Sequence, residues 1–102
     1  MAANVCELLA GRTTTGNGLG IEQQGSVRTY HGVVRGTGVV SATVKVEVSN
    51  NNVDWLELGT ITLSGTTRAS DGFAADAPWR YARGNVTAIS GTSAAVDLLV
   101  GF

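Results

Sequence analysis

The chain contains very little of several residue types that mark common protein classes. Its 102 residues include one cysteine, one proline and one histidine, and only 15% are charged. A secreted domain of this size usually carries several disulfides, which a single cysteine cannot form. Met1 to Ala10 has neither a basic segment nor an apolar run typical of a signal peptide, and no stretch is long enough for a membrane helix. We therefore expect a protein that is made in a reducing cytoplasm and has no membrane partner.

The charges that are present nearly cancel. The formal net charge is −1, which gives no electrostatic reason to bind a nucleic acid. A surface with few charges and many threonine, valine and alanine side chains is suited to contact with other proteins. We expect protein partners and no nucleic acid.

Residues that could carry catalysis or hold a metal ion are scarce. His31 is the only histidine, which excludes a multi-histidine metal cage, and no Gly-x-Ser-x-Gly motif accompanies it. We expect it to be a partly exposed residue of a sheet. Cys6 lacks basic neighbours, so we expect it to pack as a small hydrophobic residue. Asp71 and Asp76 form one of several carboxylate pairs, for which solvation of turns is the simpler interpretation. The sequence predicts no enzyme, no catalytic residue, no cofactor and no metal site.

The residues that are abundant predict an all-β fold. Valine and threonine favour strands, and the 14 glycines favour turns. Residues 42–48 alternate strictly between valine or alanine and polar residues, and residues 26–34 and 96–100 are further strand candidates. Gly36-Thr37-Gly38 is expected to end one strand, and Ser90-Gly91-Thr92-Ser93 is expected to form a turn. No segment has helical periodicity. Seven or eight short strands at this spacing predict a single sandwich or barrel.

A hairpin is expected around Ser49-Asn50-Asn51-Asn52. A loop of three residues, with Asn52 in the left-handed conformation, pairs Val46 with Leu56 and places Trp55 on the outer face. A loop of even length would bury Glu57, which is costly for an unpaired carboxylate. We therefore favour the odd loop.

The chain after this hairpin contains a bend and a long loop. The apolar parity changes after Gly59, which predicts a bulge there. Residues 64–78 lack alternation, so we expect an irregular loop in which Phe73 is the one large apolar side chain. Trp79 follows this loop and is expected to pack in the core.

Two units follow from this pattern, namely a flexible arm over residues 1–20 and a β-sandwich domain over residues 21–102. The segment 11–20 is rich in glycine and threonine, and its Gly-x-Gly-x-Gly spacing is too short for a dinucleotide site. The arm could be an ordinary mobile terminus or a segment that orders against a neighbouring subunit.

Trp55 allows three interpretations. An outward tryptophan on a sheet can anchor a protein interface, stack against a sugar, or be covered by a loop of its own domain. The sequence leaves these open, with sugar stacking the least favoured.

The second half of the chain resembles small structural proteins of tailed phages. The resemblance rests on an alternating strand, a Ser-Asn turn with its tryptophan strand, and three later segments: residues 44–48, 49–55, 58–65, 77–83 and 86–92. It implies a jelly-roll-like β-sandwich, or alternatively an immunoglobulin-like one. It also implies attachment to the outside of a capsid in the virion, after assembly in the host cytoplasm, as a homodimer or homotrimer that binds the major capsid protein.

The resulting hypothesis is a capsid decoration or cement protein of a bacteriophage. Its candidate interface residues are Arg12, Leu19, Trp55 and Phe73. The alternatives are a carbohydrate- or receptor-binding module of a phage tail, or a head-to-tail joining or tail-tube protein.

Overall fold

The computed structural model of the protein describes residues 5–23, 25, 27–76 and 78–102. Within these ranges all regular elements are β-strands, and none of the described residues forms a helix that could cross a membrane. The strands are β1 (Val5–Arg12), β2 (Gly16–Asn17), β3 (Ile21–Glu22), β4 (Val27–Ser49), β5 (Leu56–Asp76) and β6 (Tyr81–Gly101). The prediction of an all-β fold is confirmed.

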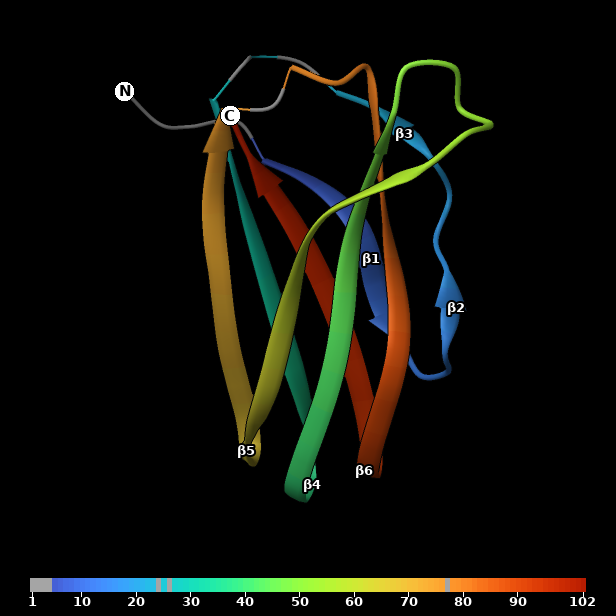
Figure 1. Ribbon diagram of the computed structural model, residues 1–102. Helices are drawn as coiled ribbons and strands as arrows, with labels where there is room; N and C mark the ends of the chain where they lie inside the picture. Colours follow the sequence, from blue (N-terminus) through green and yellow to red (C-terminus); the bar gives the residue numbers. More distant parts are fainter. Residues whose placement is uncertain (1–4, 24, 26, 77) are drawn as a thin grey trace.

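The three long strands each belong to two layers of a sandwich. Their pairing is interrupted near one end of the molecule, between residues 35 and 39 of β4, 66 and 68 of β5, and 90 and 95 of β6. Figure 1 shows the strands folding over at this end, so that their two halves run through opposite layers. The first layer, sheet 1, contains β1 with residues 27–35, 68–76 and 95–101. The second, sheet 2, contains β2 and β3 with residues 39–49, 56–66 and 81–90.

The strand order is that of a jelly roll. If β2 and β3 count as one interrupted strand, each sheet has four strand positions. Sheet 1 has the order β1, β6, β4, β5, and sheet 2 has the order β2/β3, β6, β4, β5. An immunoglobulin-like sandwich places its last strand beside the preceding strand of the chain, in the same sheet. Here the last half of β6 lies between β1 and β4, so the jelly-roll alternative holds and the immunoglobulin-like one is wrong.

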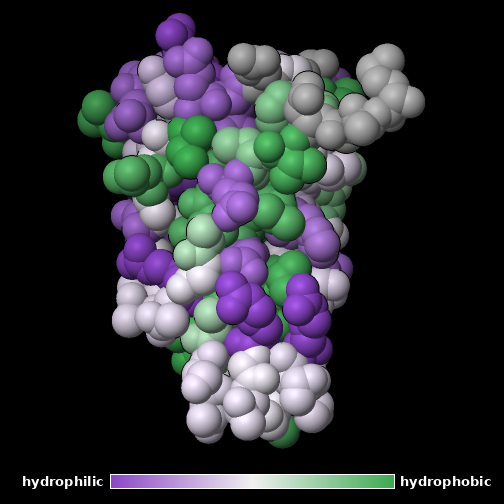
Figure 2. Space-filling view, turned by 180° about the vertical axis from the view of Figure 1, so that it is seen from behind, coloured by the Kyte–Doolittle hydropathy of each residue, from purple (hydrophilic) through white to green (hydrophobic). Residues whose placement is uncertain are grey.

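The fold-over is made by residues in the left-handed conformation. Gly38 in β4, Thr67 in β5, and Gly91 and Ser93 in β6 all have positive φ angles. Small and weakly polar residues surround them, and they form the pale tip at the lower end of Figure 2. The sequence signals at 36–38 and 90–93 therefore mark bends within continuous strands.

The core lies between the two sheets and is built by alternation. Val44, Val46 and Val48 are at most 1% exposed, whereas the residues between them point outward. On sheet 1, Val96, Leu98 and Val100 repeat this pattern and meet them from the opposite side. This burial of alternate aliphatic side chains is the main stabilising contribution to the sandwich.

The predicted hairpin is present, but its register is different. Val46 pairs with Gly59 and Val48 pairs with Leu56, so the expected pairing of Val46 with Leu56 is wrong. The loop is longer than the three residues expected, and hydrogen bonds to its own side chains hold it as a compact turn. Trp55 lies in this loop rather than in β5. The pairing skips one residue next to Gly59, so the predicted bulge is confirmed one position earlier.

The long loop predicted over residues 64–78 is wrong. The chain continues in β5 through Asp76, and Ser64 to Asp76 pairs with β4 almost throughout. Polar and small residues hide the strand signal because β5 is an edge strand of both sheets and buries few side chains. Phe73 packs on Tyr30 with ring centroids 5.2 Å apart, and it also lies against Gly59.

The flexible arm predicted over residues 1–20 is wrong for the residues that are described, while residues 1–4 lie outside them. β1 pairs with the last half of β6, and Leu8 and Leu9 are each 4% exposed in the core. β2 follows as a short strand on sheet 2. The division into an arm and a domain at residue 20 is therefore replaced by one sandwich that includes β1.

Candidate interaction surfaces

A compact loop presents Trp55 at the end of the sandwich opposite the fold-over. Ser49 Oγ accepts hydrogen bonds from the amides of Asn51 (3.1 Å) and Asn52 (3.0 Å), and Asn51 Oδ1 accepts from the amide of Asp54 (2.9 Å). Asn52 has a φ of 61°, which confirms its predicted left-handed conformation. Because short polar side chains fix the loop, the residues at its tip are held without a core of their own.

Trp55 is partly covered by its own domain. The guanidinium of Arg83 lies over its ring at 4.3 Å from the centroid, and Arg83 Nε also bonds Glu47 Oε1 at 2.7 Å. The edge of the ring lies against Gly20, where a Cβ atom would collide with it. The indole therefore contacts two segments that are distant from it in the sequence, those of Arg83 and Gly20.

Exposed apolar side chains accompany Trp55. Leu19 is 82% exposed, Val53 is 75% exposed and Leu56 is 57% exposed. Leu19 adjoins Gly20, which contacts both Trp55 and Asn52 of the loop. We call Leu19, Val53, Trp55 and Leu56 the Trp55 corner. A cluster of exposed apolar residues around a rigid aromatic side chain is typical of a protein interface.

The other two predicted interface residues do not belong to this corner. Arg12 donates hydrogen bonds to the carbonyls of Thr14, Thr15 and Asn17, so it stabilises the turn between β1 and β2. Phe73 is half-buried on sheet 1 and packs inward on Tyr30. The structure thus brings Leu19 and Trp55 together and gives Arg12 and Phe73 roles within the fold.

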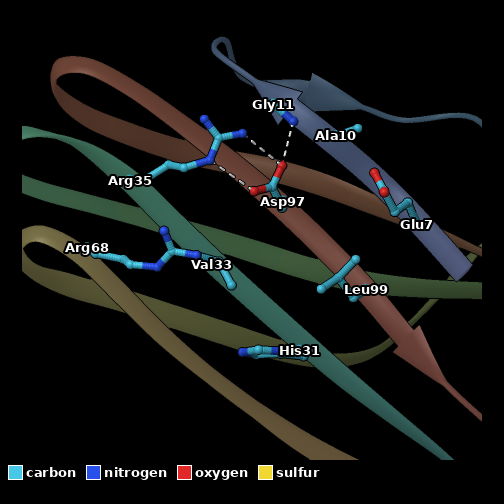
Figure 3. Close-up of a pocket in the computed structure, with 9 residues that line it drawn as sticks. All are labelled: Glu7, Ala10, Gly11, His31, Val33, Arg35, Arg68, Asp97 and Leu99. Carbon is cyan, nitrogen blue, oxygen red and sulfur yellow. Dashed lines mark hydrogen bonds and ion pairs between the residues drawn. The ribbon is translucent and has the colours of Figure 1, made fainter. Parts of the chain in front are cut away.

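A second surface is a shallow groove of about 570 Å³ on the outer face of sheet 1. Figure 3 shows Val33 and Leu99 at its centre, with His31 and Arg68 on one side and Glu7 on the other. Figure 2 views the same face, where hydrophobic residues gather in the upper half and hydrophilic residues lie among and below them.

The two arginines of this groove differ in their ion pairing. Asp97 binds Arg35 through both carboxylate oxygens, at 3.2 and 3.3 Å, and Asp97 Oδ1 also accepts the amide of Gly11 at 2.7 Å. Arg68 stands opposite Arg35 in the strand register and makes no hydrogen bond or ion pair with the described residues. Like charges that face each other across two strands are unfavourable.

The candidate nucleophile and the histidine lie apart. Cys6 pairs with the inward residue Val100 and packs against the core, as predicted. His31 is exposed on the outer face of the same sheet, also as predicted, so the sheet separates thiol from imidazole. Arg80 forms an exposed ion pair with Glu22 at 3.7 Å.

Trp79 borders a third hollow. It is partly buried against the core, in line with its predicted packing role, and it lines a space of about 280 Å³ with Asn50 and Pro78. Asn50 Oδ1 accepts the amide of Arg80 at 3.1 Å, which leaves the amide nitrogen of its side chain as a donor.

Sequence reasoning found Leu19 and Trp55 but missed Val53 and Leu56. The expected register buried Leu56 opposite Val46, and the loop was expected to end before Val53. The signal available in the sequence was the pair Ser49 and Asn51, because both residue types commonly accept hydrogen bonds from the backbone of their own loops.

A scan against protein-family models and a search of curated proteins both find no match for this sequence. Among solved structures, the chain is similar to one described as the crystal structure of the PBSX exported protein XepA. The TM-score is 0.58 with 16% identity, over 97% of this chain and 36% of that chain, so the chain spans about a third of that protein's length. At this identity the likeness shows the fold alone.

Proposed function

We propose that this protein is a structural protein of a phage virion that binds the outside of the capsid and cements it as a homo-oligomer. The observation that carries the proposal is the Trp55 corner. It offers exposed apolar area on a rigid loop, and the partner of this surface would be the major capsid protein. We propose no catalytic role and no cofactor.

Two further observations support an assignment to phage. The sequence of the second half resembles tailed-phage structural proteins. The fold is similar to that of an exported protein of the PBSX phage over nearly the whole chain.

The rigidity of the corner favours docking without rearrangement. Arg83 links the Trp55 ring to Glu47 on sheet 2, so the indole loses little freedom when a partner covers it. Leu19, Val53 and Leu56 would then be removed from water, and repetition of the contact in an oligomer would multiply its strength.

The corner is tested by charged substitutions at its most exposed apolar positions. Leu19→Asp and Val53→Asp are expected to leave the fold intact and to abolish co-sedimentation with capsids of the phage that encodes the protein. Val39→Asp is the matched control, because Val39 is also 75% exposed but lies at the fold-over end. Wild-type binding by both corner variants would refute the proposal.

A carbohydrate-binding module of a phage tail is the second candidate, favoured by the hollow beside Trp79. A planar indole beside a proline and an amide donor suits a sugar ring. In the same binding experiments, quenching of tryptophan fluorescence by neutral saccharides, with no capsid binding, would select this function instead.

A further inference from the structure

The free edge of β5 is the longest unpaired edge in the sandwich. β5 covers 21 residues and pairs with β4 on one side. Its other side faces no described strand in either sheet. An exposed edge of this length offers backbone donors and acceptors to another strand.

Two charges on this edge have no partner within the described residues. Arg68 and Asp76 are both exposed, and neither makes a hydrogen bond or ion pair there. Both point to the outer face of sheet 1, because they are an even number of residues apart in one strand. Arg68 also faces Arg35, a repulsion that no acidic group of its own strand relieves.

We infer that the β5 edge pairs antiparallel with the β5 edge of a second copy of this chain, about a two-fold axis at Gly72. In this register Arg68 of each copy stands opposite Asp76 of the other, and Ser70 stands opposite Ala74. The two unpaired charges thus become two intermolecular ion pairs. Such a contact is self-complementary, as a two-fold interface must be.

Neighbouring registers do not give this match. A shift of the two-fold axis by one residue towards the N-terminus places Asp71 opposite Asp71 of the other copy. A shift by one residue in the other direction places Arg68 opposite Pro78, which cannot donate a backbone hydrogen bond. Only the register at Gly72 keeps the outward side chains on one face and pairs opposite charges.

The surroundings of the proposed pair also fit. Val27 is 63% exposed and lies opposite Asp76 within the chain. The aliphatic stem of the second copy's Arg68 side chain would cover it.

One contact must break when the edges pair. Asp71 Oδ1 accepts the amide of Gly72 at 2.8 Å, and this bond covers the edge in the single chain. Covering an edge with a charged side chain is a known defence against unwanted pairing. The association is therefore expected to be weak and concentration-dependent, since nine residues on each side make a small interface.

The test is sedimentation velocity of the purified protein over a concentration series. Wild type is expected to shift from monomer to dimer. Arg68→Asp and Asp76→Arg alone should each weaken the dimer by about tenfold, because each places two like-charged pairs at the axis. The double variant Arg68→Asp with Asp76→Arg should restore it. Arg80→Asp, an equal charge change away from the edge, should have no effect.

Two further results bear on the same contact. Asp71→Ala is expected to strengthen the dimer, because it frees the Gly72 amide for the partner. A monomer at every concentration, a larger ring, or failure of the double variant to restore the dimer would overturn the inference. The inferred dimer is the homo-oligomer of the proposed function, and in this respect the inference rests on that function. The sedimentation experiment contains no capsid. Its failure is therefore distinct from failure of the proposed function, which wild-type capsid binding by both Leu19→Asp and Val53→Asp would show.

Discussion

At the scale of single residues, Arg83 contributes both to the candidate interface and to the electrostatics of sheet 2. Its side chain is 21% exposed, lies over the ring of Trp55, and bonds Glu47 Oε1, whose side chain is 16% exposed. Glu47 stands opposite Glu57 in the strand register, a like-charge pair that Arg83 and Lys45 counter from either side. Arg83 therefore both orients the exposed tryptophan and neutralises a half-buried carboxylate.

Removal of this side chain should cost more than removal of a surface charge. Arg83→Ala leaves the Glu47 carboxylate half-buried without its cation, and we expect a loss of about 1–3 kcal/mol in the free energy of unfolding. Lys45→Ala breaks the exposed pair with Glu57 at 3.3 Å and should cost less than about 1 kcal/mol. Urea unfolding of both variants measures the difference. Equal losses would show that the Arg83 pair is an ordinary surface contact.

The sequence predicts some of these residue roles and cannot predict others. The left-handed conformation of Asn52 followed from its local chemistry, and so did the exposed position of His31. The contact of Gly20 with Trp55 joins residues far apart in the chain, so no local pattern contains it. The Trp55 corner could therefore be predicted only in part.

At the scale of elements, central strands were predicted better than edge strands. Residues 42–48 lie in the middle of sheet 2, and burial on one face imposes the alternation that the sequence displays. β1 and the second half of β5 lie at sheet edges, where one backbone side is unpaired and small or polar residues suffice. Low hydrophobicity therefore made the second half of β5 resemble a loop, whereas β1 was assigned to an arm because the glycine- and threonine-rich segment 11–20 follows it.

Substitutions in β1 test directly whether this strand belongs to the sandwich. A flexible arm could be altered without effect, whereas β1 buries Leu9 against Gly84 and Leu98. We expect Leu9→Ala to cost about 2–5 kcal/mol, as for other buried leucines. Val5→Ala is the control, because Val5 in the same strand is 64% exposed and should cost little. If Leu9→Ala leaves the unfolding midpoint unchanged, β1 behaves as a flexible arm and does not stabilise the core.

At the scale of the whole molecule, the sandwich has two ends with different compositions. The fold-over end is rich in small glycine, serine and threonine residues, while the opposite end carries the loop of Trp55 and the hollow of Trp79. A two-fold contact along β5 would leave the loop end of each copy free for another partner. The two proposed surfaces are therefore compatible in one assembly.

The sandwich architecture could be predicted from the spacing of strands, but the strand order could not. Order depends on pairings such as that of Val5 with Gly101, which are set by three-dimensional packing. The glycines at 36–38 were expected to separate two strands. They instead bend one strand across both layers, a distinction that requires knowledge of the partner strands.

The position of each strand in the sheets predicts how its amides exchange with solvent. β4 and β6 have neighbours on both sides, whereas β1 and β5 have one. In dilute protein, hydrogen exchange followed by NMR should be slowest in β4 and β6, because their amides open only when the sandwich opens. Protection in β1 equal to that in β4 would contradict this order of local stability.

The pairing of β1 with β6 also constrains how the chain folds during synthesis. β1 emerges from the ribosome before the other strands of the sandwich, yet its partner residues 96–101 are translated after them. Until then Leu8 and Leu9 remain in water, and the hairpins of β4, β5 and β6 can form without them. The sandwich is therefore completed only after residues 96–101 have left the ribosome, and until then it exposes apolar surface that chaperones bind.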